Sequence, residues 1–139
     1  MFRRILVPVD FTPRSRRAAR VAGRMAASSR AETTLLHVIE RIDADAPGSL
    51  AGFYRKLERN ARARLAELVQ DFAARGLKAR AEVLYGSRVN EILRFSQENA
   101  VDLIVMSSHK LPLRRGGENW GTISYKVGIL SRCPVLLVK

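Results

Sequence analysis

The chain is poor in the residues that build disulfides and metal centres. It has one cysteine and two histidines among 139 residues. Cys133 cannot pair within the chain, so an internal disulfide is excluded and a reducing, cytoplasmic location is expected. No Cys and His residues show the paired spacing of a zinc site. Neither a disulfide scaffold nor a metal site is therefore expected.

Long apolar runs are also missing. No stretch approaches the roughly 20 residues that a membrane-crossing helix needs, and no charged-then-apolar leader precedes the first strand-like run. We therefore expect no transmembrane segment and no export. The length suits one domain over residues 1–139, with a core large enough to fold without staples.

Acidic residues are scarce. There are 25 Lys and Arg residues against 13 Asp and Glu residues, which gives a formal net charge of +12. Such an excess speeds encounters with polyanions. Nucleic-acid modules usually add stacking aromatics or a recognition helix, and the few aromatics here are scattered. Nucleic acid is therefore not the expected partner, and a solvated arginine-rich surface is the simpler interpretation. A single basic stripe would instead favour nucleic acid or anionic lipid.

Hydrophobic patterning predicts strands and helices in alternation. Continuously apolar runs predict buried strands, and an alternating run predicts a half-exposed edge strand. The buried strands are expected at 3–9, 32–39, 102–106 and 134–138, and the edge strand at 78–86. Strands that alternate with helices predict an α/β fold, in which a parallel sheet is wound by right-handed crossovers and carries helices on both faces.

Four helices fill the intervals between these strands. Thr12 is the expected N-cap of the first, with Pro13 at its first position. The second begins after Ser49 and ends at Gly76, the third begins after Ser87, and the fourth spans about 122–131. The second helix carries an apolar stripe at helical spacing, formed by Leu50, Phe53, Tyr54, Leu57, Ala61, Leu65, Leu68, Val69 and Phe72.

A ligand site is expected beyond the carboxyl ends of the central strands, where open parallel sheets bind their ligands. The strands at 3–9 and 102–106 are the most uniformly apolar and are the expected neighbours at the centre. The second of them leads into "SSHKLPLRRGGENWGTIS", a connection much longer than the usual two to six residues. Excess length at this place is typical of a functional loop.

This connection has the chemistry of an anion cradle. Its glycines permit a close approach of the backbone, Thr122 supplies a hydroxyl, and the following helix begins with free N–H groups and the positive end of its dipole. Lys110, Arg114 and Arg115 add cations. A phosphate group would fit here. A surface loop whose glycines only make turns is the alternative.

Catalytic motifs are missing. Ser107 or Ser108 with His37 or His109 and Asp10 could be drawn as a hydrolase triad, but no G-x-S-x-G elbow is present. The first strand is followed by "VDFTPRSR" and not by the Walker sequence G-x-x-x-x-G-K-[ST]. We therefore do not expect an enzyme, and any hydrolysis of ATP would be slow and incidental. His37 is interpreted as a core histidine with a satisfied ring nitrogen, and Cys133 as a small buried hydrophobe.

The segments "ILVPVDFTPRSRRA", "LLHVI", "DLIVMSSH", "GTISYKV" and "CPVLLVK", in this order, resemble the universal stress protein family over the whole chain. The resemblance implies a Rossmann-like sheet with strand order 3-2-1-4-5 and a homodimer. It also implies an adenine-nucleotide site at the ends of strands one and four in those members that bind ATP. Those members carry the pattern G-x2-G-x9-G-[ST] after strand four, and Mg²⁺ can accompany the nucleotide.

The chain departs from that pattern. Ser107 and Lys110 stand at the first two glycine positions, and ten residues instead of nine precede the retained pair Gly121-Thr122. Lys110 could block the approach of the backbone to the triphosphate, or its ammonium could meet the phosphates. The resemblance carries nucleotide-binding roles to Pro8, Val9, Asp10, Val38, Met106, Ser107, His109, Lys110, Gly121 and Thr122. Asp10 would accept hydrogen bonds from the ribose, or it would brace the turn before the first helix.

Two functions follow from these observations. The first is a cytoplasmic stress-response regulator that binds ATP, ADP or AMP and acts as a sensor or adaptor toward an unknown regulatory protein. The alternative is a dimeric protein-interaction module whose nucleotide site has degenerated. In both, the strand at 134–138 lies at the sheet edge and needs cover for its apolar side chains and open backbone groups. We expect a second copy to provide it, in a homodimer through this strand.

Overall fold

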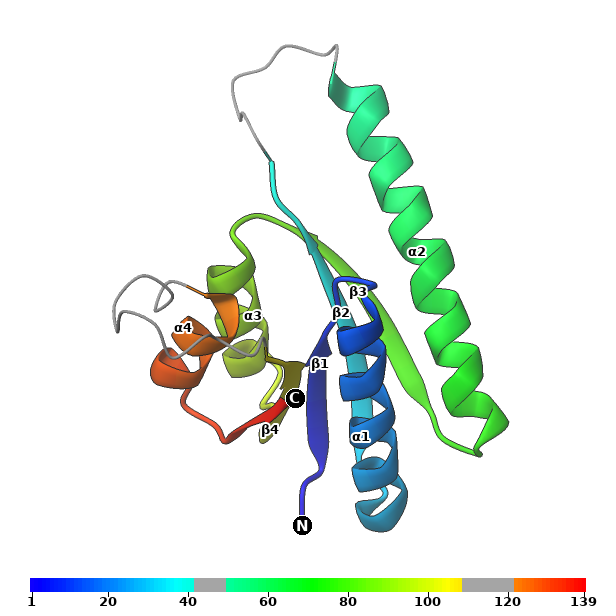
Figure 1. Cartoon of the computed structure of the whole chain (residues 1–139), viewed down its shortest axis with the longest axis vertical. Coiled ribbons are helices and arrows are strands. Elements are labelled where there is room, and N and C mark those ends of the chain that lie inside the picture. Colours follow the sequence, from blue (N-terminus) through cyan, green and yellow to red (C-terminus); the bar gives the residue numbers. More distant parts are fainter. Residues whose placement is uncertain (42–49, 109–121) are drawn as a thin grey trace.

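The computed structural model describes residues 1–41, 50–108 and 122–139. Its elements, in chain order, are β1 (Arg4–Pro8), α1 (Pro13–Ser29), β2 (Glu32–Ile39), α2 (Ala51–Ala74), β3 (Ala79–Tyr85), α3 (Arg88–Glu98), β4 (Leu103–Ser107), α4 (Ile123–Leu130) and β5 (Val135–Val138). The strands form a parallel sheet in the order β3-β2-β1-β4-β5. The predicted alternation, the strand order and the central pair β1 and β4 are confirmed (Figure 1).

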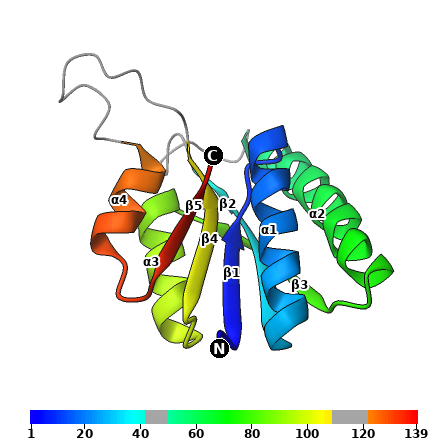
Figure 2. The same ribbon diagram turned by 60° about the horizontal axis from the view of Figure 1, so that its bottom comes forward.

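Helices cover both faces of the sheet. α1 and α2 lie on one face and α3 and α4 on the other, as Figure 2 shows with the sheet between them. Successive residues of a strand point to opposite faces, so β1 sends Ile5 and Val7 into the core under α1 and α2 and sends Leu6 into the core under α3 and α4. The central strands are therefore buried on both sides.

α1 begins and packs as its sequence predicts. The hydroxyl of Thr12 accepts a hydrogen bond from the backbone N–H of Ser15, and Pro13 opens the helix. Ala18, Ala22 and Ala26 are buried against the sheet. Because these side chains are small, the helix axis can lie close to β1 and β4.

α2 is buried over only part of its predicted stripe. Ala61, Leu65, Leu68 and Phe72 are buried, whereas Phe53 is 49% exposed. The helix has 24 residues, about 36 Å at 1.5 Å per residue. The eight residues of β2 span only about 26 Å. The amino-terminal part of α2 therefore extends past the sheet (Figure 1). The predicted cap Ser49 lies outside the described residues.

The start of α3 corrects a second expectation. Ser87 occupies the N-cap position with an extended backbone, but its side chain makes no capping hydrogen bond. The carboxylate of Glu40, at the end of β2, instead accepts a hydrogen bond from the backbone N–H of Arg88 at 3.2 Å. A side chain from a neighbouring strand thus satisfies one of the first amides of the helix.

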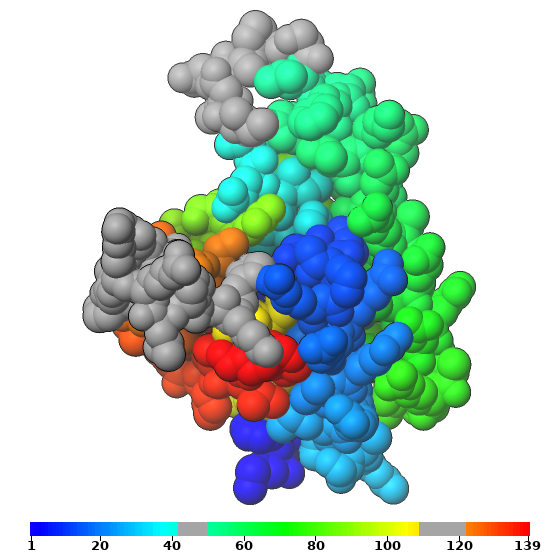
Figure 3. Space-filling model, viewed as in Figure 1, coloured from blue at the N-terminus to red at the C-terminus, as the bar shows by residue number. Residues whose placement is uncertain are grey.

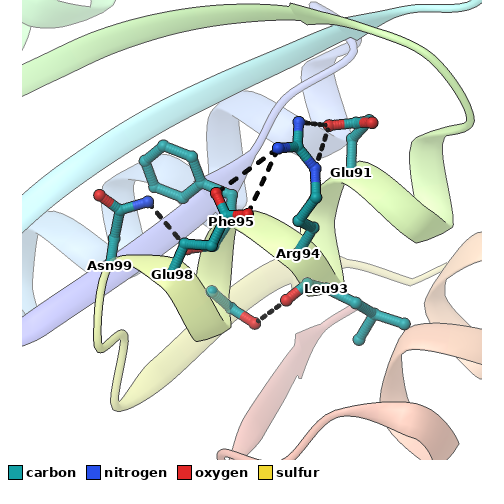
Figure 4. A network of polar contacts seen from close by, with 7 residues as sticks. Glu91, Leu93, Arg94, Phe95, Glu98 and Asn99 are labelled. Carbon is teal, nitrogen blue, oxygen red and sulfur yellow. Dashed lines mark hydrogen bonds and ion pairs between the residues drawn. The ribbon is translucent and has the colours of Figure 1, made fainter.

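The outer face of α3 carries a compact polar network (Figure 4). The guanidinium of Arg94 lies between the carboxylates of Glu91 and Glu98 and forms ion pairs with both. The side-chain amide of Asn99 donates to the carbonyl of Phe95 at 3.0 Å. The single cation of this network is therefore neutralised by its two carboxylate neighbours.

None of the helices in the described ranges combines the length and the apolar character that crossing a bilayer would require.

Candidate functional site

A cavity of about 320 Å³ opens at the carboxyl ends of β1, β2 and β4, beside the first residues of α3 and α4. Figure 2 shows the strands pointing toward the end of the molecule where α4 begins. Within the described part of the chain, the lining residues are Pro8, Val9, Asp10, Leu36, His37, Val38, Arg88, Ile92, Met106, Ser107, Thr122, Ile123 and Ser124.

Most of the residues proposed from the sequence meet at this cavity. Those that line it are Pro8, Val9, Asp10, Val38, Met106, Ser107 and Thr122. They come from the ends of three strands and the cap of α4, which are far apart in the sequence. The other three, His109, Lys110 and Gly121, lie outside the described residues.

Sequence reasoning missed several lining residues. Leu36 lies two positions before Val38 on β2, so the strand period alone would have placed it on the same face. Arg88 and Ile92 come from α3, whose start reaches the carboxyl end of the sheet because it follows a parallel strand. The signal for these two was the topology and not a local motif.

The floor of the cavity is apolar. Leu36, Val38, Ile92 and Met106 are buried and belong to the core under α3 and α4. Ligand sites typically combine such apolar walls with a few polar groups that fix orientation. This floor suits a flat, uncharged ring.

Asp10 stands at the rim and already has partners. One oxygen of its carboxylate accepts hydrogen bonds from the hydroxyl of Thr12 at 2.6 Å and from the backbone N–H of Thr12 at 3.0 Å. Partial burial raises the pKa of Asp10, but these hydrogen bonds and one from Ser15 outweigh it, so the pKa lies below its ordinary value. Asp10 is therefore an anion at neutral pH that braces the turn into α1, one of the two roles that its position suggested.

The start of α4 forms the opposite rim. Thr122 has an extended backbone, and its hydroxyl accepts a hydrogen bond from the backbone N–H of Tyr125 at 3.2 Å. The cap thus occupies one first-turn amide, while Ile123 and Ser124 line the cavity. The first amides of a helix and the positive end of its dipole favour an anion at this rim.

His37 separates this cavity from a second one. Its Nδ1 lies 2.8 Å from the carbonyl oxygen of Val9, so the ring nitrogen is satisfied as predicted. The side chain is only partly buried and lines both cavities, so His37 is not the core histidine that the sequence suggested. Burial lowers the pKa of His37, and the nearby charges of Arg88 and Arg64 act in the same direction. The second cavity, about 480 Å³ between α2 and the end of β2, shares His37, Val38 and Arg88 with the first.

The described residues hold no group of three His, Cys, Asp or Glu side chains that could bind a metal ion. Cys133 is half-buried beside the core under α3 and α4, less enclosed than its sequence suggested.

Comparisons with known proteins agree with this architecture. The model of the universal stress protein family matches residues 1–139. Universal stress protein YxiE of Bacillus subtilis is 29% identical, and the match covers 100% of both chains. The solved structure of universal stress protein UspA from Lactobacillus plantarum has a TM-score of 0.82 at 23% identity, covering 99% of this chain and 98% of that one. A universal stress protein solved in complex with cAMP has a TM-score of 0.81 at 22% identity, covering 99% and 97%. The chain therefore belongs to the universal stress protein family.

Proposed function

We propose that this protein binds an adenine nucleotide, namely ATP, ADP or AMP, in the cavity at the ends of β1 and β4. The observation that carries the proposal is that an apolar floor and a helix start line the same cavity of about 320 Å³. A nucleotide matches both features, because its base is flat and weakly polar and its phosphates are anionic. The solved relative in complex with cAMP supports the same class of ligand.

The lining residues suggest how the nucleotide would lie. Val38 and Met106 would contact the base, with Pro8 and Val9 beside it. Asp10 would accept hydrogen bonds from the ribose hydroxyls while it keeps its bonds to Thr12. Thr122 and the amides of Ile123 and Ser124 would hold the phosphates. Ser107, His109, Lys110 and Gly121 would complete the phosphate side, as the family resemblance implies.

Mg²⁺ would enter this site with the phosphates and not as a resident ion. The described residues gather no three-ligand set that would hold it alone. The cation would neutralise phosphate charge, while the chain itself would contribute the helix start and the hydroxyl of Thr122. The protein would work in the cytoplasm as a binding protein and not as an enzyme.

The role that fits such a protein is that of a sensor or adaptor in the stress response. Binding at the cavity would order the connection between β4 and α4, and the ordered connection would present a surface to a regulatory protein. Hydrogen exchange across residues 107–121 should slow when ATP is added. Unchanged exchange at saturating nucleotide would contradict this role, even if the nucleotide binds.

A homodimer through β5 belongs to the same proposal. Two carbonyl groups of this segment point to β4. The carbonyl of Val138 accepts a hydrogen bond from the N–H of Ser108, and the carbonyl of Pro134 accepts one from the N–H of Ile104. Because the backbone of a strand alternates, the polar groups of Val135 and Leu137 point to the open edge of the sheet. A second copy of β5 could pair with them and would cover Leu136, which is 37% exposed.

The phosphate role can be tested at a single backbone amide. Ile123 is the first residue of α4, a position where proline is tolerated. Ile123→Pro removes the N–H together with the side chain, whereas Ile123→Ala removes the side chain alone. Calorimetry with ATP should show that the proline variant binds at least about tenfold more weakly than the alanine variant, since a hydrogen bond to a charged group contributes roughly 1.5–3 kcal/mol.

Adenosine is the control ligand for this pair of variants, because it lacks the phosphates. Both variants should bind it equally. Millimolar ATP that gives no detectable heat with the unmodified protein would reject the nucleotide proposal. Equal losses for ATP and adenosine would reject the assignment of phosphate binding to the start of α4.

The second candidate function is a dimeric interaction module whose nucleotide site has degenerated. The observation that favours it is the engagement of Asp10 with Thr12, since the carboxylate already has a structural role. Failed titration of ATP, ADP and AMP with a stable dimer in solution would select this candidate.

A further inference from the structure

Among the helices that the structure describes, the positive charge is concentrated on one face of the sheet. α1 carries five arginines and no acidic residue, and α2 carries four arginines and one lysine against three acidic residues. The two helices lie next to each other on the same face of the molecule (Figure 3). The outward surface of residues 13–29 and 51–74 forms the α1–α2 face.

The two helices of the opposite face, α3 and α4, are nearly neutral. α3 carries two arginines and two glutamates, and α4 carries one lysine. Arg94 of α3 is held between two carboxylates (Figure 4). The arginines of the described helices are therefore spread unevenly between the two faces, whereas a surface that serves only solvation would be expected to carry them more evenly.

A row of arginines runs along α1. Arg16, Arg20 and Arg24 are spaced four residues apart, so they form one ridge at intervals of about 6 Å along the helix. All three are exposed. Of the ion pairs in the described residues, those of arginine involve Arg4, Arg62, Arg80 and Arg94, none of them on this ridge.

A groove of about 350 Å³ continues the ridge toward α2. Arg16, Arg20 and Arg64 line it together with the acidic residues Glu67 and Asp71. The two carboxylates partly offset the cations on the groove side, and the guanidinium of Arg64 also lies 5.5 Å from the ring of Phe11. Arg16 and Arg20 belong both to the ridge and to this groove, but in the described part of the chain neither forms an ion pair with the two carboxylates.

The chemistry of the ridge fits closely spaced phosphates. A guanidinium presents paired donors that match a phosphate group, and arginine cannot lose its charge at physiological pH. Phe53 is the exposed large apolar residue of the described α1–α2 face, so the face lacks both the apolar stripe of a membrane-surface helix and the stacking platform for single strands. We propose that the α1–α2 face binds the phosphate backbone of double-stranded nucleic acid without sequence preference.

From composition alone, a solvated arginine-rich surface was the simpler interpretation and nucleic acid was the alternative, which the proposal now favours. The proposal does not depend on the nucleotide site. Composition could not show that the two arginine-rich helices share a face, because that follows from the strand order. The lack of a recognition helix and of stacking aromatics argues against recognition of a base sequence. It does not argue against contact with the phosphate backbone of a nucleic acid.

Charge reversal on the ridge tests the proposal. Anisotropy of a labelled duplex of about 20 base pairs would be measured between about 50 and 200 mM salt. The test variant combines Arg16→Glu, Arg20→Glu and Arg24→Glu. The matched control combines Arg3→Glu, Lys78→Glu and Arg132→Glu, which changes the net charge equally at exposed positions just before β1, β3 and β5.

The unmodified protein should bind the duplex with a steep salt dependence. The ridge variant should bind at least about tenfold more weakly, with a logarithmic salt slope lower by about 2 to 3, because each contacted phosphate contributes about 0.9. The control variant should stay within about threefold. Thermal unfolding verifies that the variants fold, and if the glutamate variant does not, the glutamine substitutions at the same three positions replace it.

Three results would overturn the proposal. The first is no duplex binding at about 50 mM salt. The second is an equal loss in the ridge and control variants, which would mean diffuse attraction to the whole protein. The third is tighter binding to phosphatidylglycerol vesicles or to polyglutamate than to the duplex, which would assign the face to a membrane or to an acidic protein.

Discussion

Three helices of this protein end on a residue in the left-handed backbone region, and only one of these residues is glycine. The φ angles are 73° at Gly76, 55° at Arg30 and 51° at Ala100. After each, the next backbone N–H reaches back to the carbonyl five positions earlier, in the pairs Leu77 to Phe72, Ala31 to Ala26 and Val101 to Ser96. A side chain with a Cβ is strained in this region. Ala100 and Arg30 are therefore local weaknesses.

Replacing Ala100 by glycine should stabilise the protein. Relief of the Cβ strain outweighs the added freedom of the unfolded chain, so Ala100→Gly should raise the free energy of unfolding by about 0.5–1 kcal/mol. The reverse change, Gly76→Ala, should lower it by about 1 kcal/mol. An added Cβ at Gly76 meets no atom within 4 Å, so that loss reports backbone strain alone. Urea unfolding measures both, and a destabilised Ala100→Gly variant would contradict the argument.

His37 should make stability depend on pH near neutrality. Burial lowers its pKa below the ordinary value of 6.5, despite the hydrogen bond to Val9. The unfolded chain therefore binds more protons than the folded chain between these two pKa values, and the free energy of unfolding falls as the pH drops from 6.5 toward the folded-state pKa. Urea unfolding from neutral to mildly acidic pH should show this decline, and His37→Gln should reduce it. Equal pH dependence in both proteins would exclude His37 as the cause.

Single residues also show where sequence reasoning reaches its limit. The cap role of Thr12 was predictable because it depends on the next three residues only. Ser87 makes no capping hydrogen bond, and the first amide of α3, that of Arg88, is bound by Glu40, which lies 48 positions away in the sequence. A local pattern indicates that a cap is needed, but the tertiary fold decides which side chain provides it.

α2 is the element in which pattern and packing differ most. Its apolar residues keep helical spacing from end to end, but the sheet beneath it is shorter than the helix. Periodicity shows which face of a helix is apolar, and it does not show how far the opposing surface extends. The burial therefore stops near Ala61.

The two ends of the α2 stripe should respond differently to truncation. Leu65→Ala should lower the free energy of unfolding by about 2–5 kcal/mol, because Leu65 is fully buried in the core under α1 and α2. Phe53→Ala should lower it by less than about 0.5 kcal/mol, since the ring is 49% exposed. Chemical unfolding of the two variants checks the contrast, and comparable losses would mean that Phe53 is covered in solution.

For the whole molecule, the alternation of patterns was enough to predict the sheet and the end of it at which the cavity opens. Pro8, Val9, Asp10, Met106 and Ser107 follow or end apolar strands, so the carboxyl-end rule brought them to one cavity. Arg88 and Ile92 could not be found this way, because they reach it only through the crossover after β3. The nucleotide-binding roles of all ten proposed residues stay predictions, and His109, Lys110 and Gly121 also lie outside the described residues.

The proposed dimer leads to a separate prediction at this scale. Leu136→Glu should shift the protein from dimer to monomer, because it places a charge on the β5 surface that a second copy would bury. Phe53→Glu, at an exposed apolar residue far from β5, should leave the mass unchanged. Light scattering at tens of micromolar checks both, and an unmodified protein that is already monomeric would contradict the proposal.

The projecting amino-terminal end of α2 affects how the mass of this protein can be measured. A protein with a helix that extends past a rounded body has a higher hydrodynamic drag than a compact protein of the same mass. A monomer of 15.6 kDa with this outline should elute from a sizing column ahead of compact standards of equal mass. A monomer that elutes early could therefore be mistaken for a dimer. The oligomeric state has to be assigned by light scattering and not by retention volume.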